Sequence, residues 1–350
     1  MKVISGKSES GRLEDALRGI SNPDLLILIT TKDHFEAHVR ELQDRFPNVP
    51  SIGTTGIFYD STVREGTVGV VAMSGVKAAA GVLRSASTMP IRDIEAFEKT
   101  LREVGPSSKD TVCIDLCAGN DACVLTTMYS VLDKQGISLT GGTSLDGIVS
   151  VNGEIYEDAD AYAFVKNLGG RIKTYKENIY RPADDRTFVA SKVDRSNYYV
   201  GELNGKPSKQ VYMDLLNIPE SQISTQTFKN PFGKITGEDI CIISLKEVKG
   251  SGLCCYRQVN DSDVLTLLQI KDYREIVDET IQKIQDDFGR PSGVFAVNCM
   301  FRYLLFQDEH YLSDYLRSMS SVGTFCGFFA NGEHYNSQFV NQSMSCVVFE

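Results

Sequence analysis

The chain has 350 residues with a formal net charge of −10, 42% hydrophobic residues, 23% charged residues and only 10 prolines. A chain of this length usually exceeds a single hydrophobic core, and its composition is that of a folded protein, which excludes a disordered or low-complexity chain. The acidic balance and the scattered lysines and arginines exclude nucleic acid and anionic membranes as partners.

The sequence predicts a cytoplasmic protein without a cofactor. No apolar run approaches the roughly 18 residues that span a bilayer, and the first residues lack an apolar segment of signal-peptide length. Most of the nine cysteines lie in apolar, strand-like segments, which is typical of reduced core thiols. No CxxC pair occurs, so we expect no structural metal.

One strand, helix and strand pattern occurs first near the start of the chain. Residues 25–31 (LLILITT) form a continuous apolar run, and Phe35, Val39 and Leu42 follow at helical spacing. The segment SIGTTG then leads to an alternating strand over 67–74.

The same order returns twice at similar spacing. TVCIDL at 111–116 precedes a helix and the segment LTGGTSLDG, and VFAVNC at 294–299 precedes a helix, GTFCGFFANGE and the final strand SMSCVVFE. Near-constant spacing favours one supersecondary unit used three times. Chance similarity among common strand-helix-strand segments is the alternative.

The expected fold class is α+β. Short alternating strands mixed with helices favour two domains of mixed or largely antiparallel sheets covered by helices, and a doubly wound α/β fold is the alternative. Turn signals at Asn204-Gly205 and a break at Pro207 follow a polar stretch, so we place the two domains at 1–190 and 191–350.

Several motifs resemble the FIST sensory proteins over nearly the whole chain. LLILITT, SIGTTG, GGTSLDG and NGEIYEDADAYAFV are similar to the FIST N-terminal domain, and GVFAVNCMFR, GTFCGFFANGE and NQSMSCVVFE to the FIST C-terminal domain. Ser343 stands where the family more often has Thr.

The resemblance implies a small-molecule sensor rather than an enzyme. We expect a small polar or anionic ligand, such as an amino acid, and a separate signalling protein of kinase, chemoreceptor or cyclase type, with a homodimer possible. Some family members are reported to bind haem and sense nitric oxide, which makes a haem sensor the first alternative. A cysteine-dependent enzyme is the second.

Asn298, Cys299 and Arg302 form the sharpest candidate site. A strand end that leads into a helix places backbone N–H groups, a thiol and a guanidinium where an anionic group can dock. In a purely structural role, Arg302 would pair with Glu309 or Glu333.

The glycine-rich segments supply the other candidates. Glu333 and Asp146 follow two of these segments and can bind an amino group, although turn chemistry explains them equally well. The remaining candidates are hydroxyl and glycine positions that would let a ligand approach the backbone, or else serve turns and close strand packing: Thr54, Thr55, Gly142 and Thr143.

The four histidines bear on the haem and enzyme alternatives. His34 and His38 are one helical turn apart, and we place both on a solvated face without a third ligand. His334 is the better axial candidate for haem, with Cys299 as a thiolate alternative. Cys299 and His334 are also the pair that a cysteine-dependent enzyme would use.

Overall fold

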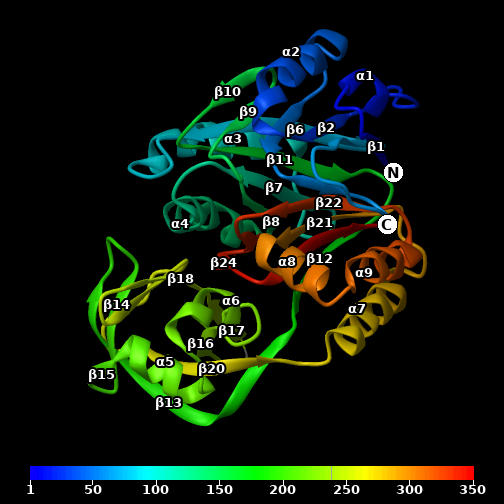
Figure 1. The fold of residues 1–350 in the computed structure, drawn as a ribbon. Helices are drawn as coiled ribbons and strands as arrows, with labels where there is room; N and C mark the ends of the chain where they lie inside the picture. The colour runs from blue at the N-terminus through cyan, green and yellow to red at the C-terminus, as the bar shows by residue number, and fades with distance from the viewer. Residues whose placement is uncertain (238) are drawn as a thin grey trace. The chain divides into compact units, whose positions relative to one another are not determined.

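The computed structural model describes residues 1–237 and 239–350, which form two compact units (Figure 1). Unit 1 consists of Met1–Glu177, Val277–Phe339 and Ser343–Glu350, and unit 2 of Asn178–Ile276 and Val340–Gln342. The chain therefore leaves unit 1 after Glu177, returns at Val277, and crosses over again for three residues before Ser343. The division of the family domains near residue 190 stays a prediction.

Unit 1 contains one arrangement three times, which confirms the predicted repeat. In each copy a buried strand, a helix and a second strand parallel to the first are followed by a later strand antiparallel to the first. The first copy has β2 (Leu25–Thr30), α2 (Phe35–Arg45), β3 (Ser51–Thr55) and β5 (Val68–Ser74); the second has β7 (Thr111–Cys117), α4 (Asp121–Leu132), β8 (Ser138–Thr143) and β11 (Ala159–Asn167); the third has β21 (Gly293–Cys299), α8 (Met300–Asp308), α9 (Leu312–Met319), β22 (Phe325–Ala330) and β25 (Ser343–Phe349).

The three copies exchange strands in a cyclic order. The strands that follow the second strand of each copy pair with the second strand of another copy: β4 (Ile57–Tyr59) with β22, β9 (Val149–Val151) with β3, and β23 (Glu333–Tyr335) with β8. Strand β10 (Glu154–Tyr156) extends β9, and β24 (Gln338–Val340) extends β23. Two outer strands also pair with another copy, since β6 (Val76–Arg84) joins β11 and β12 (Ile172–Asn178) joins β25, whereas β1 (Lys2–Ser8) joins β5 of the first copy. In Figure 1 the orange and red C-terminal strands accordingly lie among the blue and green strands of the first half.

The glycine segments make this exchange possible. Gly53, Gly141 and Gly327 occupy the second strands and lie opposite Ser150, His334 and Tyr59 of the incoming strands. A Cβ at Gly141 would collide with Asp115, and a Cβ at Gly327 would collide with the carbonyl of Ala296. At both positions the first strand of the same copy approaches the glycine, whereas a Cβ at Gly53 would lie 2.6 Å from Ser150 Oγ of the incoming strand β9.

The first strands are the most buried parts of unit 1. Every residue of β2 and β21 is buried, which explains their continuous apolar sequences. Helices α2, α4 and α8 pack on the strands of their own copies, and α1 (Leu13–Ala16) and α3 (Ile94–Val104) pack on β1 and β6. The repeat therefore places the carboxyl ends of the first strands next to helix starts.

Unit 2 is built on an antiparallel sheet. Its strand order is β17-β16-β20-β13-β14-β19-β18, with β15 beside β14. The strands are β13 (Tyr180–Asp194), β14 (Tyr199–Leu203), β15 (Lys206–Pro207), β16 (Phe232–Thr236), β17 (Asp239–Ile243), β18 (Leu245–Lys249), β19 (Gly252–Cys255) and β20 (Val264–Ile270), and the helices are α5 (Ser208–Leu216) and α6 (Ile223–Gln226). Phe188, Tyr212 and Phe232 are the large aromatic residues of its core. Helix α7 (Tyr273–Phe288) leads back to unit 1.

The α+β prediction is confirmed. Among the described residues, β2 with β3, β7 with β8, and β21 with β22 pair in parallel, and the other strand pairs of known register are antiparallel. Pairs of this kind within mixed sheets differ from the continuous parallel sheet of a doubly wound fold. Within the same residues, no helix is long and apolar enough to span a bilayer.

Candidate functional site

Arg302 lies at the centre of a buried polar group in the third copy of unit 1. Strand β21 ends at Cys299, which is the N-cap residue of α8, and this places Arg302 in the first turn of the helix. Arg302 has no exposed surface, and Cys299 is 2% exposed. The sequence predicted this strand-to-helix junction correctly, but not that its arginine is entirely enclosed.

The guanidinium of Arg302 is held by an ion pair and two aromatic rings. It donates through Nη2 to Glu177 of β12, and its centre lies 4.8 Å from the ring of Phe306 and 5.1 Å from that of Tyr315. Burial lowers the pKa of Arg302, but the charge of Glu177, its hydrogen bond and the nearby Tyr315 and Glu333 together hold the pKa above its usual value. The expected partners were Glu309 and Glu333, so the ion pair with Glu177 corrects that expectation.

Glu333 belongs to the same group. Its Oε2 accepts hydrogen bonds from the backbone N and the Oγ of Ser343 at 3.1 and 2.6 Å, and the side chain is completely buried. Burial raises the pKa of Glu333 to about 8, although Ser343, Cys299 and the charge of Arg302 each lower it. We call Arg302, Glu177, Glu333 and Asn298 the Arg302 group.

Asn298 ties the group to a strand from the first copy. Its Nδ2 donates to the hydroxyl of Tyr59 at 2.6 Å, and its Oδ1 accepts from the hydroxyl of Tyr315 at 3.1 Å. Tyr59 in turn donates to the carbonyl of Ala296 at 2.8 Å. Asn298 therefore positions Tyr59 and Tyr315 through the two ends of its amide.

Four buried atoms of the Arg302 group have no hydrogen-bond partner among the described residues. They are Nε and Nη1 of Arg302, Oε2 of Glu177 and Oε1 of Glu333. A buried polar atom without a partner costs about 1–3 kcal/mol, and more when it is charged. This concentration of unpaired donors and acceptors makes the Arg302 group our candidate site for a small polar molecule.

The glycine and hydroxyl candidates divide between two places. Thr54 and Thr55 bond the 144–148 loop, through Ile148 O at 3.2 Å and Ser144 Oγ at 3.0 Å, and the exposed Asp146 donates its backbone N to Thr55 Oγ1. These hydrogen bonds fit turn and loop chemistry.

Gly142 and Thr143 lie beside β23 instead. Gly142 pairs with Glu333, and a Cβ at Gly142 would lie 2.6 Å from Gly332 O, so this position serves close strand approach. Thr143 donates from Oγ1 to Asp121 Oδ1 at 2.6 Å.

A second buried charge group surrounds His334. The His334 group consists of His334, Asp115, Asp121 and Asp160. His334 Nδ1 lies 2.5 Å from Asp115 Oδ2, and its Nε2 lies 2.8 Å from Asp121 Oδ1. Burial lowers the pKa of His334, but the two carboxylates raise it well above its usual value, so the ring is an imidazolium. Burial and the nearby Asp115 raise the pKa of Asp160 well above its usual value.

The His334 group does not suit haem or a Cys-His pair. Both ring nitrogens bond carboxylates and the ring has no exposed surface, so neither nitrogen is available to iron or to the thiol of Cys299. Within residues 1–237 and 239–350, no cluster of His, Cys, Asp and Glu is arranged to hold a metal ion.

His38 corrects the expectation of a solvated histidine pair. His34 is exposed, but His38 is buried, with Nδ1 2.8 Å from Thr30 Oγ1 and Nε2 3.0 Å from Gly11 O. Burial lowers the pKa of His38. Its ring therefore ties α2 to β2 as a neutral structural residue.

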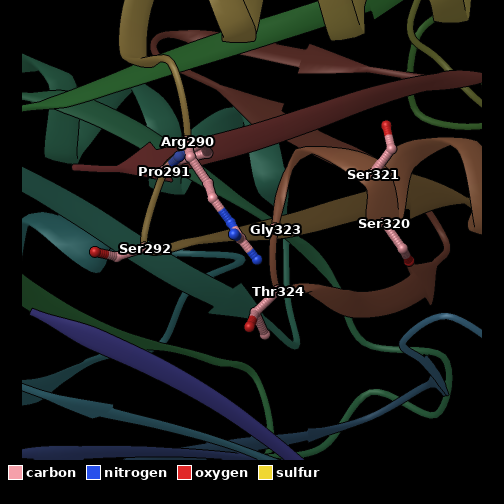
Figure 2. Close-up of a pocket in the computed structure, with 7 residues that line it drawn as sticks. All are labelled: Arg290, Pro291, Ser292, Ser320, Ser321, Gly323 and Thr324. Carbon is pink, nitrogen blue, oxygen red and sulfur yellow. The ribbon is translucent and has the colours of Figure 1, made fainter.

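A surface hollow lies at the opposite end of β21 and β22 from Arg302. Figure 2 shows its lining of Arg290, Pro291, Ser292, Ser320, Ser321, Gly323 and Thr324, and its volume is about 440 Å³. The hollow adjoins the C-terminal end of α9, where the partial negative charge of the helix dipole opposes an anion at Arg290. We therefore do not assign the candidate site to this hollow.

Sequence reasoning missed Glu177, Tyr59, Ser343 and Tyr315 as members or neighbours of the site. Glu177 and Tyr59 arrive on strands exchanged from the other copies, and Ser343 begins the last strand. The repeat itself was the available signal, because equivalent strands in each copy predict equivalent neighbours.

Comparison with known families gives two matches in tandem. The model of the FIST N domain matches residues 24–206, and the model of the FIST C domain matches residues 209–336. No curated protein was found to match the chain. The matched ranges include every member of the Arg302 group and the His334 group.

Proposed function

The chain belongs to the FIST family of sensory proteins, and we propose that it is a cytoplasmic sensor that binds a small polar or anionic metabolite, such as an amino acid, in the Arg302 group. The proposal includes a separate signalling protein of kinase, chemoreceptor or cyclase type as the reader of the bound state. It treats the chain as a binding protein rather than an enzyme.

The unpaired atoms of the Arg302 group carry the proposal. An unpaired nitrogen of the guanidinium can donate a charge-assisted hydrogen bond to a carboxylate. The unpaired oxygen of Glu177 can accept a hydrogen bond from an amino group. A ligand that satisfied these atoms would recover part of the free energy that their burial costs. Its binding would therefore stabilise the fold.

The covalent connections offer a route for the signal. Glu177, the partner of Arg302, is the last residue of unit 1 before Asn178 of unit 2. Ser343, which holds Glu333, directly follows the three residues Val340–Gln342 of unit 2. A ligand that repositions Glu177 or Glu333 thus acts next to two points where the chain passes between units, and we infer that a partner reads the resulting change.

Three observations favour this function over its alternatives. His334 is engaged by Asp115 and Asp121, which removes the axial ligand of a haem sensor and the base of a cysteine enzyme. None of the nine cysteines, which all lie in the described part of the chain, forms a disulfide, as expected in the reducing cytoplasm. Cys299 is almost entirely enclosed, unlike an activated nucleophile.

A thermal-unfolding screen tests the proposal. The purified chain is heated with each of the common amino acids and with acetate and succinate, and at least one should raise the unfolding temperature in a saturable way. At a concentration about a hundredfold above Kd, the stabilisation would be about 2.7 kcal/mol.

The matched variant replaces the buried ion pair by apolar side chains. Arg302→Met with Glu177→Leu keeps the interior filled without an uncompensated charge, so the fold should survive while the ligand effect disappears. Arg317→Met removes an exposed arginine and should keep the effect. If the double variant retained the full stabilisation, the Arg302 group would not be the site.

A further inference from the structure

The two carboxyl oxygens of Glu333 have different surroundings. Oε2 accepts from the backbone N and the Oγ of Ser343, whereas Oε1 has no partner among the described residues. A protonated carboxyl group has one O–H donor, and an oxygen that already accepts two hydrogen bonds is the poorer place for it. The proton of neutral Glu333 therefore belongs on Oε1.

The groups that face Glu333 come from several elements. Arg302 of α8 and Cys299 of β21 interact with its carboxyl group directly, and Glu177 of β12 neutralises Arg302. Tyr315 of α9 and Cys346 of β25 complete the titratable neighbours of the ion pair. Strand β8 contributes Gly142 opposite Glu333 and brings no charge. Glu333 therefore has a single cation nearby, and Glu177 already compensates it.

Neutral Glu333 and Arg302 both present hydrogen-bond donors, which suit one acceptor-rich ligand. Neutral Glu333 offers the O–H of Oε1, and Arg302 offers Nε on one edge of its guanidinium and Nη1 on another, so a carboxylate can accept from Oε1–H and from one of these two nitrogens. Ionised Glu333 would instead offer a negative oxygen without a proton and repel the same carboxylate. Glu333 was first expected to bind an amino group, and its burial assigns it the opposite polarity.

We propose that neutral Glu333 donates a hydrogen bond from Oε1 to a carboxylate held by Arg302, and that ionisation of Glu333 expels this ligand. The inference rests on the proposed function and specifies its ligand class and its regulation. Because burial raises the pKa of Glu333 to about 8, the switch operates just above neutral pH. Above that pH, each carboxylate that binds takes up one proton from solvent, which restores the acid.

Acetate binding measured by titration calorimetry over a pH series tests the proposal. The Kd of the full chain for acetate should be constant near pH 7 and rise about tenfold for each pH unit once Glu333 is ionised, because one proton is linked to binding. Above that pH, titrations in two buffers of different ionisation enthalpy should report uptake of one proton per acetate.

Glu333→Gln provides the matched variant. The amide keeps an oxygen for Ser343 and supplies an N–H donor in place of Oε1–H, so acetate should still bind, with a Kd that no longer depends on pH. Glu95→Gln, at an exposed position of α3, should keep the pH dependence of the unmodified chain.

The outcomes separate this inference from the proposed function. If the unmodified chain bound acetate with the same Kd across the series, or more tightly at high pH, the inference would fail while an Arg302-dependent ligand could still stand. Saturable binding of methylammonium at Glu333 in place of acetate would also overturn it. If no carboxylate bound or stabilised the chain at any pH, the proposed function would fail first and the inference with it.

Discussion

Glu333 and His334 are neighbours on β23, and their side chains enter two different buried charge groups. Glu333 accepts from Ser343 Oγ at 2.6 Å beside Arg302, whereas His334 lies 2.5 Å from Asp115 Oδ2. Successive side chains of a strand point to opposite faces, so one short strand from the third copy serves both groups. Both buried charge groups therefore depend on the position of β23 beside β8.

His334→Gln tests whether the imidazolium holds β23 in place. The substitution removes the positive charge between Asp115 and Asp121 and leaves buried carboxylates without compensation. We expect a loss of about 3–5 kcal/mol in the free energy of unfolding, measured by urea denaturation of the full chain. His34→Gln, at an exposed position, should change little, and equal losses in the two variants would contradict the role of His334.

The same residue gives the unfolding free energy a pH dependence. Since the pKa of folded His334 lies well above its unfolded value, its contribution is complete below the unfolded pKa and is lost as pH rises through the folded pKa. Stability measured by urea denaturation should fall with rising alkaline pH in the unmodified chain. In His334→Gln this part of the slope should vanish, and an unchanged slope would show that another group causes it.

Gly142→Ala tests the exchange of strands between copies. A Cβ at this position would lie 2.6 Å from the carbonyl oxygen of Gly332, the residue directly before β23, which pairs with β8. Overpacking of this kind costs about 1–3 kcal/mol or prevents folding. Gly169→Ala is the control, because its Cβ would lie 3.1 Å from the N-terminal nitrogen of Met1 and 3.7 Å from Asn167 Oδ1. Equal urea midpoints for the two variants would contradict the close approach of β23 to β8.

Thiol labelling distinguishes a binding protein from a cysteine enzyme. Cys299 is 2% exposed, whereas Cys123 and Cys241 are partly exposed. Iodoacetamide at neutral pH should therefore modify Cys123 and Cys241 first and leave Cys299 unmodified in the folded chain, as followed by peptide mass spectrometry. Faster modification of Cys299 than of both others would revive the enzyme alternative.

Haem addition is expected to leave the protein colourless. His334 has no free ring nitrogen and Cys299 is enclosed, so neither residue suits an axial ligand in this fold. The visible spectrum and the native mass should be unchanged after haem is added and unbound haem is removed. A Soret band with a stoichiometric mass increase that His334→Ala abolished would contradict this expectation.

The sequence predicted local structure well and long-range partners poorly. Apolar periodicity located the first strands, the helices and the glycine segments, because each reflects nearby residues. It also selected Asn298, Arg302 and Glu333, which the fold brings into one buried group. The sequence did not predict Glu177 and Tyr59 as part of the site, because both lie on strands that pair with another copy. No local pattern shows which sheet a strand joins.

Burial was the second quantity that local patterns misjudged. His38 is followed by charged residues, yet it faces Thr30 and the carbonyl of Gly11. Arg302 was expected near a strand end with an open approach, but it lies beneath aromatic rings. Both differences arise because tertiary packing, rather than the charge of adjacent residues, determines what a side chain faces.

A crystal structure of the chain grown with the compound that most raises its unfolding temperature tests the central claim most directly. We predict electron density for that compound within hydrogen-bond distance of Arg302 Nε or Nη1 and of Glu333 Oε1, the atoms that lack partners in the present structure. Density for the compound elsewhere in the molecule, with these atoms paired only to water, would contradict the assignment of the ligand site to the Arg302 group.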